Sequence, residues 1–192
     1  MAISFCSRGA ASDTPSRRRG VFLTGSTADD VEIAIANESD LDGILELQAA
    51  NQISRGGLLS ASFSRAQLQR TMEGMPLVVA RRGQGIVGFL VCWATDTTGD
   101  VPIIRSMLDS YPGRARDAYI YGPICIDVHQ RGQGLAQLLF EEIKRQLPGR
   151  EGVLFIRRDN DASIRSHRKM GMNEVSRFSD GGIEHIVLSY VG

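Results

Sequence analysis

Residues 119–147, YIYGPICIDVHQRGQGLAQLLFEEIKRQL, decide the fold and the position of the site. The run through Val128 is nearly continuously apolar, which predicts a central strand buried on both faces of a sheet. Apolar residues then recur at helical spacing, which predicts an amphipathic helix over 135–147. These residues are Leu135, Leu138, Leu139, Ile143 and Leu147. A glycine-rich turn, residues 131–136, joins the strand to the helix.

This turn has the properties of an anion site. The first turn of a helix exposes unpaired backbone N–H groups and the positive end of the helix dipole. Gly132 and Gly134 allow the main chain to approach a ligand, and Arg131 adds a positive charge. A phosphate or pyrophosphate is the expected ligand. The alternative is that the glycines only start the helix tightly.

The letters RGQG occur twice, and the other copy serves as a control. In residues 82–85 the same four letters join two predicted strands, 77–80 and 86–95. No helix begins there, so that copy is assigned to turn chemistry alone. A glycine pattern predicts a site only in the right structural context. Neither a P-loop nor a complete dinucleotide-binding fingerprint is present in 131–136.

The central strand is interrupted at Gly122-Pro123. Proline has no N–H to donate to a neighbouring strand, so the sheet should be bulged or open at this point. An opening in the middle of the sheet would lie just before the anion-binding turn.

The whole sequence indicates one soluble domain in a reducing compartment. The chain has 192 residues, 22 Lys and Arg against 22 Asp and Glu, and three widely spaced cysteines. This composition predicts no nucleic acid, no membrane, no metal and no disulfide framework, and a cytoplasmic location. We place the domain at residues 29–192. Residues 1–28, rich in Ser, Arg and Gly, are interpreted as a disordered tail, with an organelle transit peptide as the alternative.

The predicted order of elements is that of an α/β chain with a mixed sheet. Strands are expected at 31–36, 77–80, 86–95, 119–128, 153–156, 175–178 and 183–190. Helices are expected near 39–50, 64–74, 100–111, 135–147 and 162–170. Ser39 and Ser64 are the expected caps of the first two helices, and Asp100 that of the third, an insertion of about 20 residues.

Two segments resemble the GNAT-type N-acetyltransferases. The segment IDVHQRGQGLAQLLF (126–140) resembles the family's coenzyme A motif R/Q-x-x-G-x-G/A, with Arg131, Gly134 and Ala136 at the fixed positions. The segment NDASIRSHRKMGM (160–172) looks like the family's second motif. The resemblance covers about residues 31–190. It implies a GNAT-like fold: a central, mixed, twisted sheet of about six or seven strands, flanked by helices, with a splayed central strand.

The resemblance also implies which residues hold acetyl-CoA. Main-chain groups of Ile124, Cys125 and Ile126 would bind the pantetheine arm, and Asn160 would contact it. The pyrophosphate would lie on the turn, whose residues are Arg131, Gly132, Gln133, Gly134, Leu135 and Ala136. Acetyl-CoA is a co-substrate in this scheme.

The catalytic groups are less well determined. His167 stands where many members of the family have a tyrosine, and it is predicted to be the general acid for the leaving thiolate. Its alternative is an ordinary packing histidine. No base stands out. Tyr121 is retained as a candidate catalytic residue, beside Tyr119, Glu184 and His185. Asp127 is expected to serve the turn.

The resulting hypothesis is an N-acetyltransferase that moves the acetyl group of acetyl-CoA directly to a primary amine. The acceptor, a small molecule or a protein, is not identified; loop 52–64 and the insertion should line its site. The alternatives are a non-catalytic acyl-CoA-binding sensor and a different phosphate-binding protein. A homodimer through the last hairpin or the inserted helix is compatible with the sequence.

Overall fold

The computed structural model describes residues 31–57, 59, 61–96 and 101–192. The predicted tail at 1–28 and the predicted cap Asp100 lie outside these residues. Within them, seven strands form one mixed sheet in the order β1-β2-β3-β4-β5-β7-β6. The strands are β1 (Val31–Ile35), β2 (Leu77–Arg82), β3 (Gly85–Ala94), β4 (Tyr119–Ile126), β5 (Glu151–Arg157), β6 (Asn173–Asp180) and β7 (Ile183–Val191).

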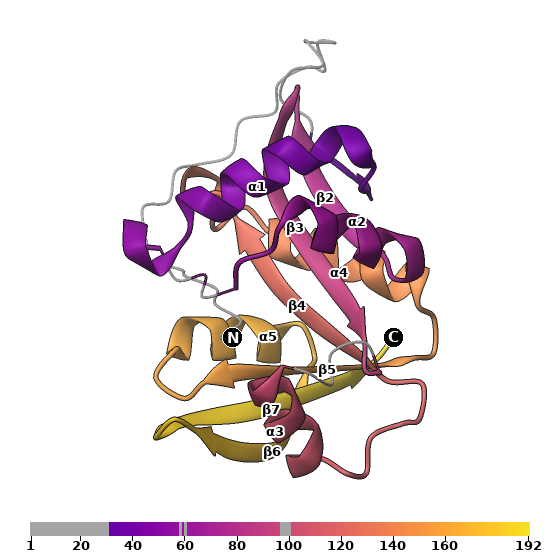
Figure 1. Cartoon of the computed structure of the whole chain (residues 1–192), viewed down its shortest axis with the longest axis vertical. Coiled ribbons are helices and arrows are strands. Elements are labelled where there is room, and N and C mark those ends of the chain that lie inside the picture. The colour runs from indigo at the N-terminus through magenta and orange to yellow at the C-terminus, as the bar shows by residue number, and fades with distance from the viewer. Residues whose placement is uncertain (1–30, 58, 60, 97–100) are drawn as a thin grey trace, which may run out of the picture.

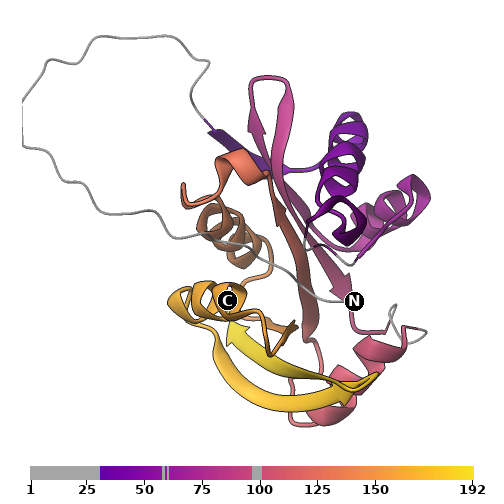
Figure 2. The same ribbon diagram turned by 90° about the vertical axis from the view of Figure 1, so that its left-hand side faces the viewer.

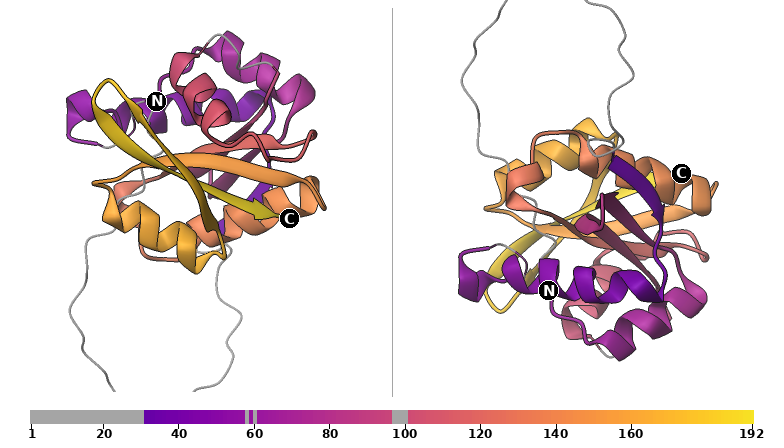
Figure 3. Two further views of the ribbon diagram at one scale, coloured as in Figure 1. Left: turned by 90° about the horizontal axis from the view of Figure 1, so that it is seen from below. Right: turned by 90° about the horizontal axis from the view of Figure 1, so that it is seen from above.

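The helices form a layer on each face of the sheet (Figures 2 and 3). They are α1 (Leu41–Ala50), α2 (Arg65–Gly74), α3 (Pro102–Ser110), α4 (Leu135–Gln146) and α5 (Asp161–Lys169). α4 and α5 cover one face, and their apolar side chains join the main core cluster. On the other face, α1 and α2 pack on β3, and α3 packs on β6. The predicted fold class is therefore confirmed.

Strand β4 is central, as the apolar run predicts, and all eight of its residues are buried. On one side it pairs with β3, and the register shifts between Leu90 and Cys92, opposite the Gly122-Pro123 interruption. That peptide bond is cis.

On its other side β4 separates from β5. The two parallel strands pair only at Tyr119↔Gly152 and Ile120↔Val153, within strands that are fully described. β4 and β5 therefore lie together at one end and diverge toward the other, as Figure 1 shows. The edge of residues 124–126 that faces β5 has no strand beside it. The opening expected from the proline is present.

The ends of two helices test the capping predictions. Ser64 caps α2 through a capping box with Gln67, as predicted. At α1 the prediction was wrong: Ser39 lies inside a short 3₁₀ turn at Glu38–Asp40 that precedes the helix. Asn37 caps that turn, and Asp40 is the N-cap of α1 without a side-chain cap bond. The Asn37 side chain accepts from the backbone N–H of Ser39, while Asp40 accepts from the N–H of Asn37 at 2.8 Å.

The insertion between β3 and β4 is fixed to the body by a buried carboxylate. Glu151, at the start of β5, accepts from the Tyr111 hydroxyl at 3.0 Å and from the Ala115 N–H at 2.6 Å. The Ser189 hydroxyl of β7 donates to the same carboxylate. Of the helices in the described part of the chain, none combines the length and apolarity that a membrane span requires.

Candidate active site

The glycine turn has the conformation that an anion site requires. Gly132 and Gly134 have φ of +79° and +80°, in the left-handed region that favours glycine. Gly134 is the N-cap of α4 and has no side-chain cap, so the first N–H groups of the helix are served by no capping side chain. A Cβ at either glycine would meet no atom within 4 Å. The space in front of the turn is therefore open.

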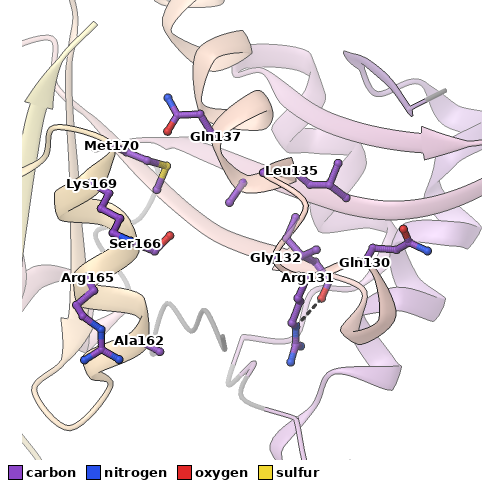
Figure 4. Close-up of a pocket in the computed structure, with 13 residues that line it drawn as sticks. Gln130, Arg131, Gly132, Leu135, Gln137, Ala162, Arg165, Ser166, Lys169 and Met170 are labelled. Carbon is purple, nitrogen blue, oxygen red and sulfur yellow. Dashed lines mark hydrogen bonds between the residues drawn. The ribbon is translucent and has the colours of Figure 1, made fainter. Parts of the chain in front are cut away.

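A cleft of about 380 Å³ lies between this turn and α5. Figure 4 shows the two elements facing each other across it, and Ile126 contributes from the end of β4. The cleft wall formed by α5 consists of Ala162, Arg165, Ser166, Lys169 and Met170. Two cationic side chains, Arg165 and Lys169, therefore line the cleft opposite the helix N-terminus.

Sequence reasoning missed Arg165 and most of this wall. The signal was available, because residues 162, 165, 166 and 169 recur at helical spacing and share one face of α5. Arg168 and Lys169 are adjacent in the sequence. The structure separates them: Lys169 lines the cleft, while Arg168 pairs with Glu174 at 2.6 Å.

Arg131 lies at the edge of the cleft, but its guanidinium is engaged in two hydrogen bonds. Nε donates to the carbonyl oxygen of Ile126 at 3.2 Å, the bond drawn in Figure 4. Nη2 donates to Oδ1 of Asn51, at the end of α1, at 2.7 Å. The Arg131 side chain thus ties the turn to β4 and to α1.

The other residues predicted to bind the donor lie beside the opening. Ile124 and Ile126 point into the core under α4, and Cys125 points to the opposite cluster under α1. Burial raises the pKa of the Cys125 thiol to about 12, so this side chain is a packing group. Asn160 is the N-cap of α5, and its Oδ1 accepts from the Ser163 N–H at 3.1 Å.

His167 is fully buried on the inner side of α5. Its Nδ1 lies 2.8 Å from the carbonyl oxygen of Ser163. Because a carbonyl only accepts, Nδ1 carries the proton in the neutral ring, and Nε2 is then the atom with the lone pair. Burial lowers the pKa of His167 to about 4, against the raising effect of the Ser163 bond. At neutral pH this histidine is a neutral ring whose Nε2 can accept a hydrogen bond.

Tyr121 lies where the two strands part. It is the first β4 residue beyond the last pair with β5, and its ring meets that of His167 edge to face at 5.8 Å. Its hydroxyl is buried and finds no hydrogen-bond partner among the described residues. Burial raises the pKa of Tyr121 well above its ordinary value, so the phenol keeps its proton.

The remaining candidates have structural roles in the described residues. Asp127 caps the short turn Val128–Gln130 by accepting from the His129 N–H at 2.7 Å. The Tyr119 hydroxyl bonds that of Tyr190. His185 stacks on Phe178 with centroids 4.9 Å apart. Glu184 is exposed. Nowhere in the described ranges do three or more His, Cys, Asp or Glu side chains group as metal ligands.

A split central strand, a glycine turn at a helix N-terminus and a facing helix define a class of acyl-transfer protein. Residues 44–172 match the model of the acetyltransferase (GNAT) family. The chain therefore belongs to the GNAT acetyltransferase family. A search of curated proteins found no match.

Solved structures of low sequence identity share the fold. The ribosomal-protein-S18-alanine N-acetyltransferase of Escherichia coli superposes with a TM-score of 0.61 at 16% identity, over 84% of this chain and 94% of that one. A putative acetyltransferase from Salmonella typhimurium with its cofactor acetyl-CoA gives 0.62 at 15%, over 85% and 94%. The ribosomal-protein-alanine N-acetyltransferase of Brucella melitensis gives 0.60 at 19%, over 83% and 99%.

Proposed function

We propose that the protein transfers the acetyl group of acetyl-CoA directly to a primary amine of a small molecule or a protein. The observation that carries this proposal is the loss of β4–β5 pairing beyond Ile120, which leaves the edge of β4 unpaired from Tyr121 to Ile126, and Ile126 lines the cleft at the glycine turn. An extended acyl carrier with an anionic end fits an unpaired strand edge that ends at such a cleft. The open space before Gly132 and Gly134 fits the anion.

Different parts of the donor would contact different elements: the pyrophosphate would lie at the glycine turn, and the pantetheine arm along β4. The pyrophosphate would accept from the backbone N–H groups of residues 131–136, with Arg165 and Lys169 supplying positive charge from α5. The exposed edge of residues 124–126 would hydrogen-bond the pantetheine arm as an added strand does. Asn160, at the N-terminus of α5, is proposed to contact the same arm.

The reaction requires one bond to form and one to break. The neutral amine nitrogen attacks the thioester carbonyl and gives up one proton to water in the site. The C–S bond breaks, and the leaving thiolate takes a proton from the protein, which is reprotonated from solvent. A backbone N–H of β4 would stabilise the oxyanion. Tyr121 would donate this proton, because its phenol is protonated at neutral pH and its hydroxyl has no hydrogen-bond partner among the described residues.

The predicted role of His167 as the acid meets a chemical difficulty. As an acid through Nε2, His167 would need the doubly protonated form, which its lowered pKa makes scarce at neutral pH. We therefore propose Tyr121 as the acid and His167 as the ring that holds it in place. His167→Ala tests the earlier assignment: a large loss of turnover in His167→Ala with Tyr121→Phe unaffected would restore His167 as the acid.

An amine panel with free-thiol detection tests the function. Turnover with at least one amine, together with calorimetric binding of acetyl-CoA and CoA, is expected. Binding of ATP but not of CoA would contradict the assignment.

A non-catalytic acyl-CoA sensor is the second candidate. It is favoured by one observation: Asp127, the carboxylate nearest the turn on the central strand, is engaged as a cap and does not serve as a base. Tight CoA binding with no turnover across a broad amine panel would select the sensor.

A further inference from the structure

The Arg131 guanidinium links two parts of the protein that are 80 residues apart in sequence. One end of this link lies on the side of the proposed donor site. Arg131 is the first residue of the glycine turn, and its Nε donates a hydrogen bond to the carbonyl oxygen of Ile126 at the end of β4. The other end is Asn51, which is nearly buried, with 7% of its surface exposed. Its Oδ1 accepts from Arg131 at 2.7 Å, and its Nδ2 donates to the Leu47 carbonyl at 2.9 Å.

Asn51 is also the attachment point of the segment that follows α1. The Leu59 N–H donates to the Asn51 carbonyl oxygen at 2.9 Å. Gly57 packs so closely on the Asn51 main chain that a Cβ there would lie 1.9 Å from its oxygen. The far end of the segment is fixed as well, since the buried Gln48 amide accepts from the Phe63 N–H at 2.9 Å.

This segment faces the side of the sheet opposite the cleft. Phe63 stacks near Trp93 of β3, with ring centroids 5.1 Å apart, in the cluster under α1 and α2. The donor cleft lies on the α4 and α5 face. The path from Ile126 through Arg131 and Asn51 to Leu59 therefore crosses from the donor side of the sheet to the other side.

We propose that Arg131 and Asn51 are positioning residues that couple donor binding to the order of the segment after α1, on the acceptor side. The proposal rests on the proposed function, because it takes acetyl-CoA as the ligand of the turn. An anion bound on the turn fixes the main chain of residues 131–134. It therefore also fixes the Cα and Cβ atoms from which the Arg131 side chain extends. The fixed guanidinium holds Asn51, and Asn51 holds Leu59.

The coupling follows from shared ordering. When the acceptor binds, the segment after α1 loses conformational entropy. If the bound donor has already ordered that segment through the turn, this entropy cost of acceptor binding is smaller. Because such coupling is reciprocal, an acceptor that orders the segment would raise the affinity for the donor by the same factor.

Amide hydrogen exchange in the full chain tests the proposal without requiring the amine. The reporters are the amides of Leu59 and Phe63, measured by NMR with and without saturating acetyl-CoA. In the wild type, acetyl-CoA is expected to slow exchange at Leu59 by about fivefold or more. Calorimetry on the same samples measures donor binding.

Two variants break the link in different ways, and a third is the matched control. Arg131→Lys keeps the positive charge at the turn but loses the planar fork that reaches two acceptors. Asn51→Ala removes the acceptor from α1. Arg82→Ala removes another arginine that contacts the same turn, by donating to Gln133 Oε1 at 3.1 Å, but does not touch Asn51.

Arg131→Lys and Asn51→Ala should each abolish the slowing at Leu59 at saturating acetyl-CoA, whereas Arg82→Ala should retain it. The double variant should lose no more coupling than either single one. Slowing that persists in both single variants, or a wild type that binds acetyl-CoA with no change at Leu59, overturns the coupling. A wild type with no heat of acetyl-CoA binding overturns the proposed function instead, and the coupling with it.

Discussion

At the scale of the residue, the arrangement of Tyr121 and His167 is the main departure from what the sequence predicted. Substitution of Tyr121 by Phe removes the hydroxyl and keeps the ring packing. It should lower kcat by about 100-fold or more with little change in acetyl-CoA affinity, because a positioned general acid contributes about 10²–10⁴-fold. Steady-state kinetics and calorimetry measure the two quantities.

Tyr119→Phe is the matched control for this change. Tyr119 lies two residues away on the same strand and is equally buried, but its hydroxyl is bonded to Tyr190. It should lose some stability and keep its kcat. Equal kcat losses in the two variants would remove Tyr121 from the chemistry.

The low pKa of His167 has a consequence for stability. The ring takes up a proton near pH 6.5 when the chain is unfolded and near pH 4 when it is folded. Between these values the unfolded state binds more protons, so the free energy of unfolding must fall as pH falls from 6.5 toward 4, by up to about 1.4 kcal/mol per pH unit.

His167→Asn should reduce this slope, since its amide can still donate to Ser163 but does not titrate. Urea denaturation at several pH values measures the slopes. Because burial also lowers the pKa of His185, the variant should keep part of the slope. Identical slopes in the variant and the wild type would show that His167 is not buried as a neutral ring.

At the scale of the element, the two RGQG copies allow an internally controlled test of the glycine turn. Gly134→Ala and Gly83→Ala each place a Cβ on a residue of positive φ with open space around it. Both should cost about 1–2 kcal/mol of stability. Only Gly134→Ala should also weaken acetyl-CoA binding, because its Cβ enters the space where the anion lies. Equal affinities in the two variants would argue that the turn does not contact the donor.

The α5 face gives a second test at this scale. Lys169→Ala removes a cation that lines the cleft, and Arg168→Ala removes its neighbour, which pairs with Glu174 instead. We expect Lys169→Ala to weaken acetyl-CoA binding by about 1 kcal/mol at low salt and by less at high salt, as for an exposed charge. Arg168→Ala should have little effect. Calorimetry at two salt concentrations separates the outcomes.

At the scale of the whole molecule, the insertion is held by one buried carboxylate. Glu151→Ala leaves the Ala115 N–H and the Tyr111 and Ser189 hydroxyls without their acceptor. The free energy of unfolding should fall by about 1–3 kcal/mol, since the Ser189 hydroxyl would stay buried without its acceptor. Glu141→Ala, which removes an exposed pair with Lys144, should change it by less than about 0.5 kcal/mol. Urea denaturation compares them, and similar losses in both would mean that Glu151 does not anchor the insertion.

The sequence by itself determined the order of the elements, the central strand, its interruption and the glycine turn at the start of α4. These features depend on local rules: the apolar run and the helical spacing reflect burial, Gly122-Pro123 removes a strand donor, and glycine allows positive φ. The same locality explains the correct cap at Ser64. It also explains the wrong one at Ser39, which lies inside a 3₁₀ turn, so that α1 begins only at Leu41.

Only the tertiary structure decided how side chains far apart in sequence are used. Arg131 forms hydrogen bonds with Asn51, 80 residues away, and α5 contributes Arg165 and Lys169 to the cleft. The protonation of His167 depends on the Ser163 carbonyl and on burial by residues from other elements. Desolvation and side-chain hydrogen bonds are properties of the packed chain, so the sequence could locate the glycine turn but not assign the proton-transfer groups.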